Sequence, residues 1–308
     1  MKLHTAIEQY IALKRSLGFR FHSESVILTA FSKTMGNVSL GQVKPRALRA
    51  YLDGKGPITR HWHRKWETLR PFYRFVIARG LVRRSPVPTR APKLDAIFTA
   101  YIYSQAELRR ILQAITPERT CGLSPQTVRA LLLLLYGAGL RISEALKLEI
   151  RDVDLQQRLL WVRQSKFFKS RLVPIGPQLT QVLRDYERDR PASRPPYRCF
   201  FCTTKVTPVT RSTVERIFAK LRLAADVKRT DGGRFQPRLH DLRHTAAVHR
   251  LVAWYKKGAD VQSLLVKLSA YLGHIDISAT QKYVTWTPEL REQANDRFAR
   301  YALGGSNE

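Results

Sequence analysis

The stretch RLHDLRHTAA, residues 238–247, carries two arginines, two histidines and an aspartate on one expected helix. Burial of so many polar groups is unfavourable unless each of them finds a partner. His240 and Arg243 stand three residues apart, so they share one face of that helix. Such a face is either a solvated surface or the contact surface for a partner that is not protein.

Further residues whose side chains could take part in catalysis or binding occur at three other points of the chain. GAGLRISEAL presents Arg141 directly after a glycine turn, with Glu144 one helical turn later. Lys166 lies where a hairpin turn should begin. The segment YLGH ends at His274, and Tyr283 follows nine residues later.

Metal-free cleavage of a DNA strand requires these residue types. Arginines bind the phosphate oxygens that gain charge in the transition state, often in bidentate geometry. A nucleophile attacks in line, and a lysine or histidine protonates the departing 5′-oxygen. No carboxylate cluster suits magnesium, and Cys199 and Cys202 lack two further zinc ligands at suitable spacing. We therefore expect neither a metal nor another cofactor.

The charge of the chain predicts a polyanionic partner. Lysine and arginine total 54 against 24 aspartates and glutamates, which gives a net charge of +30. The basic residues are spread along the whole chain, which favours nucleic acid over a membrane surface. No apolar run is long enough to span a bilayer, and the first residues lack the apolar region of a signal peptide. We expect a cytosolic protein that does not interact with membranes.

The first ninety residues predict helices. Apolar residues recur at helical spacing before Gly18, and a second helix should run from near Pro45 to Gly54. A long aromatic-rich helix follows and should stop at Gly80. Its aromatic residues are typical of a bundle core, whereas their basic neighbours are the expected DNA contacts: Arg60, Arg64 and Lys65. Three prolines between residues 86 and 92 then indicate a semi-rigid linker.

The remainder of the chain predicts a mixture of helices and strands. Ser104 and Glu107 form a capping box at a helix start. RLLWVRQ and RLVPI predict a hairpin through KFFKS, and YRCFFCT predicts another strand with both cysteines buried. Further helices are expected from Pro177, from a capping box at Ser212, over 240–256, 260–272 and 278–284, and from Pro288.

Five of these motifs, taken in order and spacing, carry a family resemblance. GAGLRISEALKL, a hairpin lysine before RLVPI, HDLRHT, YLGH and the following tyrosine resemble the tyrosine recombinase (phage integrase) family. The resemblance covers about residues 98–290. The segment from Trp254 to Val284 is similar to a transposon-associated branch, which hints at a mobile element.

The resemblance implies a fold and a domain organisation. It predicts two domains: an all-α N-terminal core-binding helical bundle and a mixed α+β tyrosine-recombinase catalytic domain. We place the helical DNA-binding domain at residues 1–90, a linker at 91–97 and the catalytic domain at 98–308. Together they would grip one DNA duplex from opposite sides as a C-shaped clamp.

The resemblance also implies a role for each motif residue. Arg141 and Arg243 would clamp the scissile phosphate, and Tyr283 would attack it to form a 3′-phosphotyrosyl link. Lys166 would protonate the leaving 5′-oxygen. Because the turn SKFFKS lacks the glycines usual in the family, Lys169 is the alternative acid.

The histidines and Glu144 complete the implied site. His240 would take the tyrosine proton or hold a phosphate oxygen, and His274 would donate a hydrogen bond to the phosphate. Glu144 would orient Arg141 or a histidine. The covalent intermediate retains the energy of the broken bond, so religation needs no ATP.

The implied function is that of a site-specific DNA recombinase or integrase in the bacterial cytosol and nucleoid. Its expected partners are double-stranded DNA, three further copies in a homo-tetramer on two DNA sites, and accessory recombination proteins. Strand exchange would proceed through a Holliday junction. Two alternatives stay open: a catalytically inactive DNA-binding regulator, and DNA relaxation like that of a type IB topoisomerase.

Overall fold

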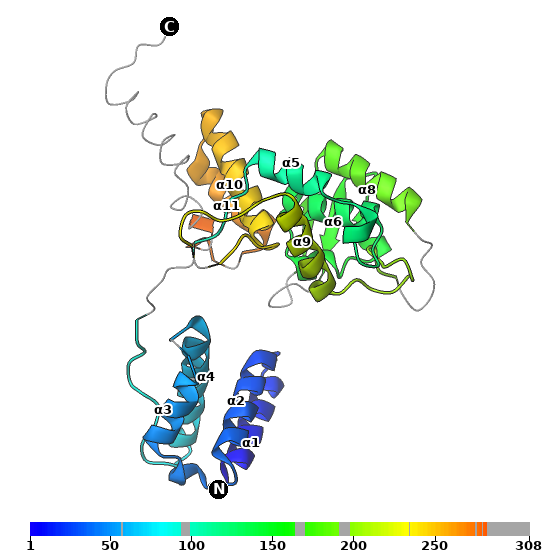
Figure 1. The fold of residues 1–308 in the computed structure, drawn as a ribbon. Coiled ribbons are helices and arrows are strands. Elements are labelled where there is room, and N and C mark those ends of the chain that lie inside the picture. The colour runs from blue at the N-terminus through cyan, green and yellow to red at the C-terminus, as the bar shows by residue number, and fades with distance from the viewer. Residues whose placement is uncertain are drawn as a thin grey trace, which may run out of the picture. The chain divides into compact units, whose positions relative to one another are not determined.

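The computed structural model describes residues 1–56, 58–93, 99–163, 170–190, 198–233, 235–274, 276–278 and 280–281. These fall into two compact units, Met1–Ile97 and Phe98–Glu308 (Figure 1). Lys166, Lys169 and Tyr283 lie outside the described residues, as does the helix expected from Pro288. Most of the helix expected over 278–284 lies outside them too.

Helices make up most of the first unit. They are α1 (Leu3–Ser16), α2 (His22–Met35), α3 (Pro45–Asp53) and α4 (Arg60–Ala78), with a 3-10 turn at Leu40–Gln42. Pro45 is the first residue of α3 and Gly54 follows its end, as the sequence predicts. The long aromatic helix is confirmed as α4.

The core of this unit is aromatic. Trp62, Phe72 and Tyr73 are each at most 2% exposed, which confirms that they pack inside. The Tyr10 ring meets the Phe72 ring edge-on, with centroids 5.6 Å apart. Lys65, the third expected DNA contact, is half-buried, and its contact with DNA stays a prediction. Its half-buried ammonium donates to Tyr51 O at 2.6 Å, because burial of the long stem brings it over the Tyr51 ring.

The second unit combines helices with a small sheet. Its helices are α5 (Gln105–Gln113), α6 (Pro125–Gly137), α7 (Ile142–Ala145), α8 (Pro177–Asp189), α9 (Arg211–Ala224), α10 (Asp241–Lys256) and α11 (Val261–Leu272). Two 3-10 turns lie at Pro117–Arg119 and Ile150–Asp152. The strands are β1 (Val153–Asp154), β2 (Leu159–Val162) and β3 (Arg171–Pro174).

The expected hairpin is confirmed. Strands β2 and β3 pair antiparallel, with Leu160 opposite Val173, and β1 extends the sheet on the other side of β2. Leu160 and Val173 are fully buried and pack in the same apolar core as the leucines of α6. Helices α10 and α11 pack against each other (Figure 1), and their apolar residues form a smaller second core.

Two expectations about this unit are wrong. Residues 198–203 form no strand and make only isolated bridges, Glu149 to Cys199 and Cys202 to Pro208. Alternation in a strand would send Phe200 and Phe201 to opposite faces, whereas both are buried in one core. Cys202 is buried, but Cys199 is only half-buried.

Helix α9 begins two residues earlier than the capping box at Ser212 predicts. Its N-cap is Thr210, whose hydroxyl accepts from Thr213 N at 3.2 Å, so Ser212 lies inside the first turn. Both residue types can cap, and the register is set by burial of Val214 and Ile217. Among the described residues, no helix has the length and apolar character needed to cross a membrane.

Candidate active site

The site is built around the C-terminal end of α11. Gly273 adopts the left-handed conformation (φ 67°, ψ 44°), and its N–H donates to Ala270 O at 3.0 Å. The N–H of His274 reaches back to Ser269 O at 3.0 Å. This is a Schellman motif, which ends the helix and leaves its last carbonyls without partners inside the helix.

Three arginines from three other elements supply those partners. Arg141 precedes α7, Arg171 begins β3 and Arg243 lies in the first turn of α10. They donate to the consecutive carbonyls of residues 271–273: Arg171 Nε to Tyr271 O at 3.0 Å, Arg243 Nη2 to Leu272 O at 2.6 Å and Arg141 Nη2 to Gly273 O at 3.1 Å. Cations at this end of a helix are also favoured by its dipole.

The same three arginines surround the carboxylate of Glu144. Arg141 Nη1 lies 2.7 Å from Oε1, and the backbone N–H of Arg141 donates to Oε2 at 3.0 Å. Arg171 binds both oxygens, at 3.2 Å and 2.9 Å, and Arg243 Nη1 lies 3.9 Å from Oε2. Burial by itself would raise the pKa of Glu144, but the bonds and charges of Arg171 and Arg141 lower it to about 2.

The glycine turn before Arg141 fits against α11. Gly139 has a φ of +60°, and a Cβ there would lie 2.7 Å from Leu272 Cδ2. Its carbonyl accepts from Arg243 Nη1 at 2.5 Å. The sequence GAGLR therefore brings the α6–α7 turn close enough to α11 for Arg141 to reach the carbonyl of Gly273.

Three histidines accompany the arginines. The rings of His240 and His244 pack edge to face with centroids 4.9 Å apart, and His274 Nδ1 lies 2.7 Å from Thr280 Oγ1. Burial, followed by the positive charge of Arg243, lowers the pKa of His240 and of His274 to about 4. His240 is solvent-exposed, and the neighbouring Arg243 guanidinium disfavours the charged form of its ring. Both rings are neutral at pH 7, and so each can accept or donate one hydrogen bond.

The polar residues of RLHDLRHTAA find partners in the structure. Asp241 is 2% exposed and binds Arg238 through both the backbone N–H, at 2.9 Å, and the guanidinium, at 3.0 Å. Tyr103 donates through its hydroxyl to Arg238 O and through its N–H to Thr245 Oγ1, both at 3.0 Å. These contacts fix the start of α10 and thereby the position of Arg243.

The cluster carries an excess of positive charge that suits an anion. Three guanidiniums meet the single carboxylate of Glu144, and the histidines are neutral at pH 7. The exposed fraction of the side chain is 26% for Arg141, 13% for Arg171 and 3% for Arg243, so Arg141 is the most accessible. Within the described ranges, no group of His, Cys, Asp or Glu is arranged to hold a metal ion. The geometry suits a phosphodiester held by arginines.

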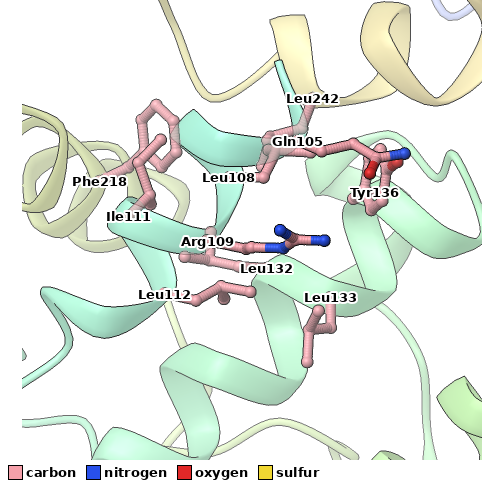
Figure 2. Close-up of a pocket in the computed structure, with 10 residues that line it drawn as sticks. All are labelled: Gln105, Leu108, Arg109, Ile111, Leu112, Leu132, Leu133, Tyr136, Phe218 and Leu242. Carbon is pink, nitrogen blue, oxygen red and sulfur yellow. The ribbon is translucent and has the colours of Figure 1, made fainter. Parts of the chain in front are cut away.

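A separate pocket of about 210 Å³ lies between α5 and α6. Figure 2 shows its lining, which includes Leu108, Leu112, Leu132 and Phe218, with Arg109 among them. None of its lining residues belongs to the arginine cluster. The lining is mostly apolar and has one arginine, Arg109, whereas three arginines converge at the end of α11, so we place the candidate active site there.

Sequence reasoning found most of the described cluster. Arg141, Glu144, Arg243 and His274 lie together, and the charges of Arg243 and Arg141 act on His240. It missed Arg171. A charged residue at a strand start is usually solvated, and its partner Glu144 lies 27 residues away in the chain. The signal that could have found it is the RLVPI motif, of which Arg171 is the first residue.

Comparisons with known proteins identify the family. The model of the phage integrase family matches residues 103–289, which is more than half of the chain. An integrase/recombinase of Sinorhizobium fredii, y4rB, is 32% identical over 304 residues, covering 96% of each chain. The tyrosine recombinase XerC of Lacticaseibacillus casei is 32% identical over 228 residues, covering 71% of this chain and 70% of that protein.

Solved structures share the fold. A lambda integrase (75–356) dimer bound to a COC′ core site matches with a TM-score of 0.68 at 21% identity, covering 92% of this chain and 95% of the other. The Tn1549 transposon integrase in complex with a circular intermediate DNA matches with a TM-score of 0.70 at 16% identity, covering 95% and 99%. The chain belongs to the phage integrase family, and it is a tyrosine-type site-specific recombinase.

Proposed function

We propose that this recombinase cuts and rejoins double-stranded DNA through a 3′-phosphotyrosyl intermediate on Tyr283. The observation that carries the proposal is the convergence of three guanidiniums on one carboxylate at the end of α11. A half-buried site with excess positive charge is stabilised by an anion, and a phosphodiester has the matching charge and oxygen geometry.

Each residue of the site has a proposed role. Arg141 and Arg243 hold the non-bridging oxygens of the phosphate, and Glu144 orients Arg141. His240, neutral at pH 7, takes the tyrosine proton or binds a phosphate oxygen, and His274 binds the phosphate. Lys166 protonates the leaving 5′-oxygen, with Lys169 as the alternative. No metal or cofactor takes part.

The first unit and the assembly have proposed roles as well. Residues 1–90 would be an all-α core-binding domain, 91–97 a linker and 98–308 the catalytic domain, with the first and last gripping one duplex. Arg60 and Arg64 are exposed on α4 and available to DNA phosphates. Four copies would act on two DNA sites in the bacterial cytosol, aided by accessory recombination proteins. The lambda integrase tetramer bound to a Holliday junction supports this assembly. The Tn1549 transposon integrase supports a role in a mobile element.

Covalent trapping on DNA tests this function. A duplex from the end of the parent element, nicked beside the scissile phosphate, loses the short 5′-hydroxyl fragment after cleavage and cannot be religated. We expect the protein to become attached to this DNA with EDTA present. Tyr283→Phe should bind the same DNA with unchanged affinity and form no adduct, because the substitution removes only the nucleophilic oxygen.

Three outcomes would contradict the proposal. Absence of an adduct from the unaltered protein, with tight DNA binding retained, would favour the regulator. Strict dependence of cleavage on added magnesium would exclude the metal-free mechanism. Relaxation of supercoiled plasmids without any joining of two sites would favour the topoisomerase-like activity.

A further inference from the structure

Arg171, the first residue of β3, has no role in the mechanism above, yet its guanidinium makes three hydrogen bonds within the cluster. Nη1 and Nη2 bind the two oxygens of Glu144 at 3.2 Å and 2.9 Å, and Nε donates to Tyr271 O at 3.0 Å. Its side chain is 13% exposed. A bidentate pair fixes both the position and the orientation of a carboxylate.

The surroundings of Arg171 are built to fit a planar guanidinium. A Cβ on Gly273 would lie 2.6 Å from Arg171 Nη1 and 2.7 Å from Cζ, so the backbone of Gly273 lies directly against the guanidinium. The φ of +67° at Gly273 also favours glycine. A lysine could keep one bond to Glu144, but it could not form the fork or reach Tyr271 O at the same time.

Arg171 acts on Arg141 through Glu144. Each carboxylate oxygen of Glu144 is shared between these two arginines, since Oε1 accepts from both Nη1 atoms and Oε2 from Arg171 Nη2 and the Arg141 backbone. Arg171 also holds the end of α11, whose Gly273 carbonyl binds Arg141. Loss of Arg171 would remove two of the hydrogen bonds to the Glu144 carboxylate. It would also remove the hydrogen bond to the Tyr271 carbonyl at the end of α11.

We propose that Arg171 is a positioning residue for DNA cleavage: it fixes Glu144 and the end of α11 so that Arg141 meets the phosphate in one orientation. Because Arg171 is the first residue of β3, it also links the β2–β3 hairpin to Arg141 through Glu144. The inference rests on the proposed function, since it assigns phosphate binding to Arg141. Arg171 itself touches protein groups on both sides.

Single-turnover cleavage of the nicked DNA at saturating protein tests this role. Arg171→Ala should cleave about 100-fold more slowly, as expected for a misplaced catalytic group, while its DNA affinity changes less than about threefold. Arg171→Lys should recover about tenfold of that rate through its remaining bond to Glu144. Melting temperatures, measured in parallel, separate unfolding from slow chemistry.

The pH dependence of cleavage distinguishes positioning from a general structural role. Glu144 faces Arg141, Arg171 and Arg243. Its negative charge also acts on His274, whose pKa it raises. Without Arg171, burial of Glu144 raises its pKa toward the assay range. The deficit of Arg171→Ala relative to the unaltered protein should therefore grow as the pH falls from about 8 to about 5. Arg171→Ala combined with Glu144→Gln should lose this pH dependence.

Arg163→Ala is the matched control. Arg163 follows β2, on the other side of the same hairpin segment, and pairs with the buried carboxylate of Asp152. We expect the Arg163→Ala variant to cleave DNA at the rate of the unaltered protein.

An equal, pH-independent loss of cleavage rate in Arg163→Ala and Arg171→Ala would overturn the inference. A defect of Arg171→Ala that is confined to DNA affinity would overturn it as well. An unaltered protein that forms no adduct would instead contradict the proposed function, whereas an active protein with an equally active Arg171→Ala variant would overturn this inference alone.

Discussion

Glu144 and Asp152 are two buried carboxylates that occupy the same local position in the chain. Each is the third residue of a short helical turn and accepts from the backbone N–H of its N-cap, Arg141 at 3.0 Å and Glu149 at 3.1 Å. Their exposed fractions are 7% and 4%. The local sequence therefore places both carboxylates in the same way.

The two carboxylates differ in the cations that the fold brings to them. Asp152 meets the guanidinium of Arg163, whose side chain is 41% exposed and shares its charge with water. Glu144 meets three guanidiniums, with side chains 26%, 13% and 3% exposed. The first arrangement is a neutral structural pair, whereas the second keeps an excess of positive charge. The number of converging arginines, and not the capping motif, makes one of them an anion site.

Removal of each carboxylate should give the largest difference between the two regions. Glu144→Ala leaves three close guanidiniums uncompensated and should lower the free energy of unfolding by about 3–5 kcal/mol. Asp152→Ala should cost about 1–3 kcal/mol, since water can solvate Arg163. Urea unfolding measures both values. Cleavage per folded molecule should be lost only in Glu144→Ala, and equal cleavage by the two variants would remove the distinction drawn above.

Acid should weaken the Glu144 region in a defined pH window. Because the pKa of Glu144 is lowered from 4.5 to about 2 in the folded protein, its contribution is complete above pH 4.5 and is lost as the pH falls toward 2. The contribution is about 3 kcal/mol. The difference in unfolding free energy between the unaltered protein and Glu144→Gln should therefore shrink across this window. A difference that stays constant from pH 6 to pH 3 would show that the arginines do not hold Glu144 ionised.

A smaller effect should come from the glycine that makes room for Arg171. Gly273→Ala introduces both an unfavourable φ and a close contact, and should cost about 2–3 kcal/mol. Gly258→Ala is the control, because Gly258 has a φ of +69° with no atom within 4 Å of the added Cβ. It should cost about 1 kcal/mol. Urea unfolding gives the difference, and equal losses would mean that Arg171 moves aside freely.

Much of the fold follows from local patterns in the sequence. Pro45, Gly54 and the Ser104–Glu107 capping box mark helix ends that the structure confirms. The hairpin was also predictable, since the runs around Leu160 and Val173 have strand composition and a short connection. The strand predicted around Phe200 and Phe201 was wrong, because the strand propensity of a segment does not determine whether another strand is available to pair with it.

The sequence by itself determined the family and the residues that could bind a phosphate. The motifs that contain these residues can be recognised from their order in the sequence: Arg141, His240, Arg243 and His274. The domain boundaries and the catalytic roles inferred from these motifs remain predictions. Only the tertiary structure decided which cations meet. Arg171 Nε, Arg243 Nη2 and Arg141 Nη2 bind three consecutive carbonyls of α11 across separations of 100, 29 and 132 residues. Electrostatic energy depends on distance in space, so an ordinary strand-start arginine and a Schellman glycine became parts of one site only when the chain folded.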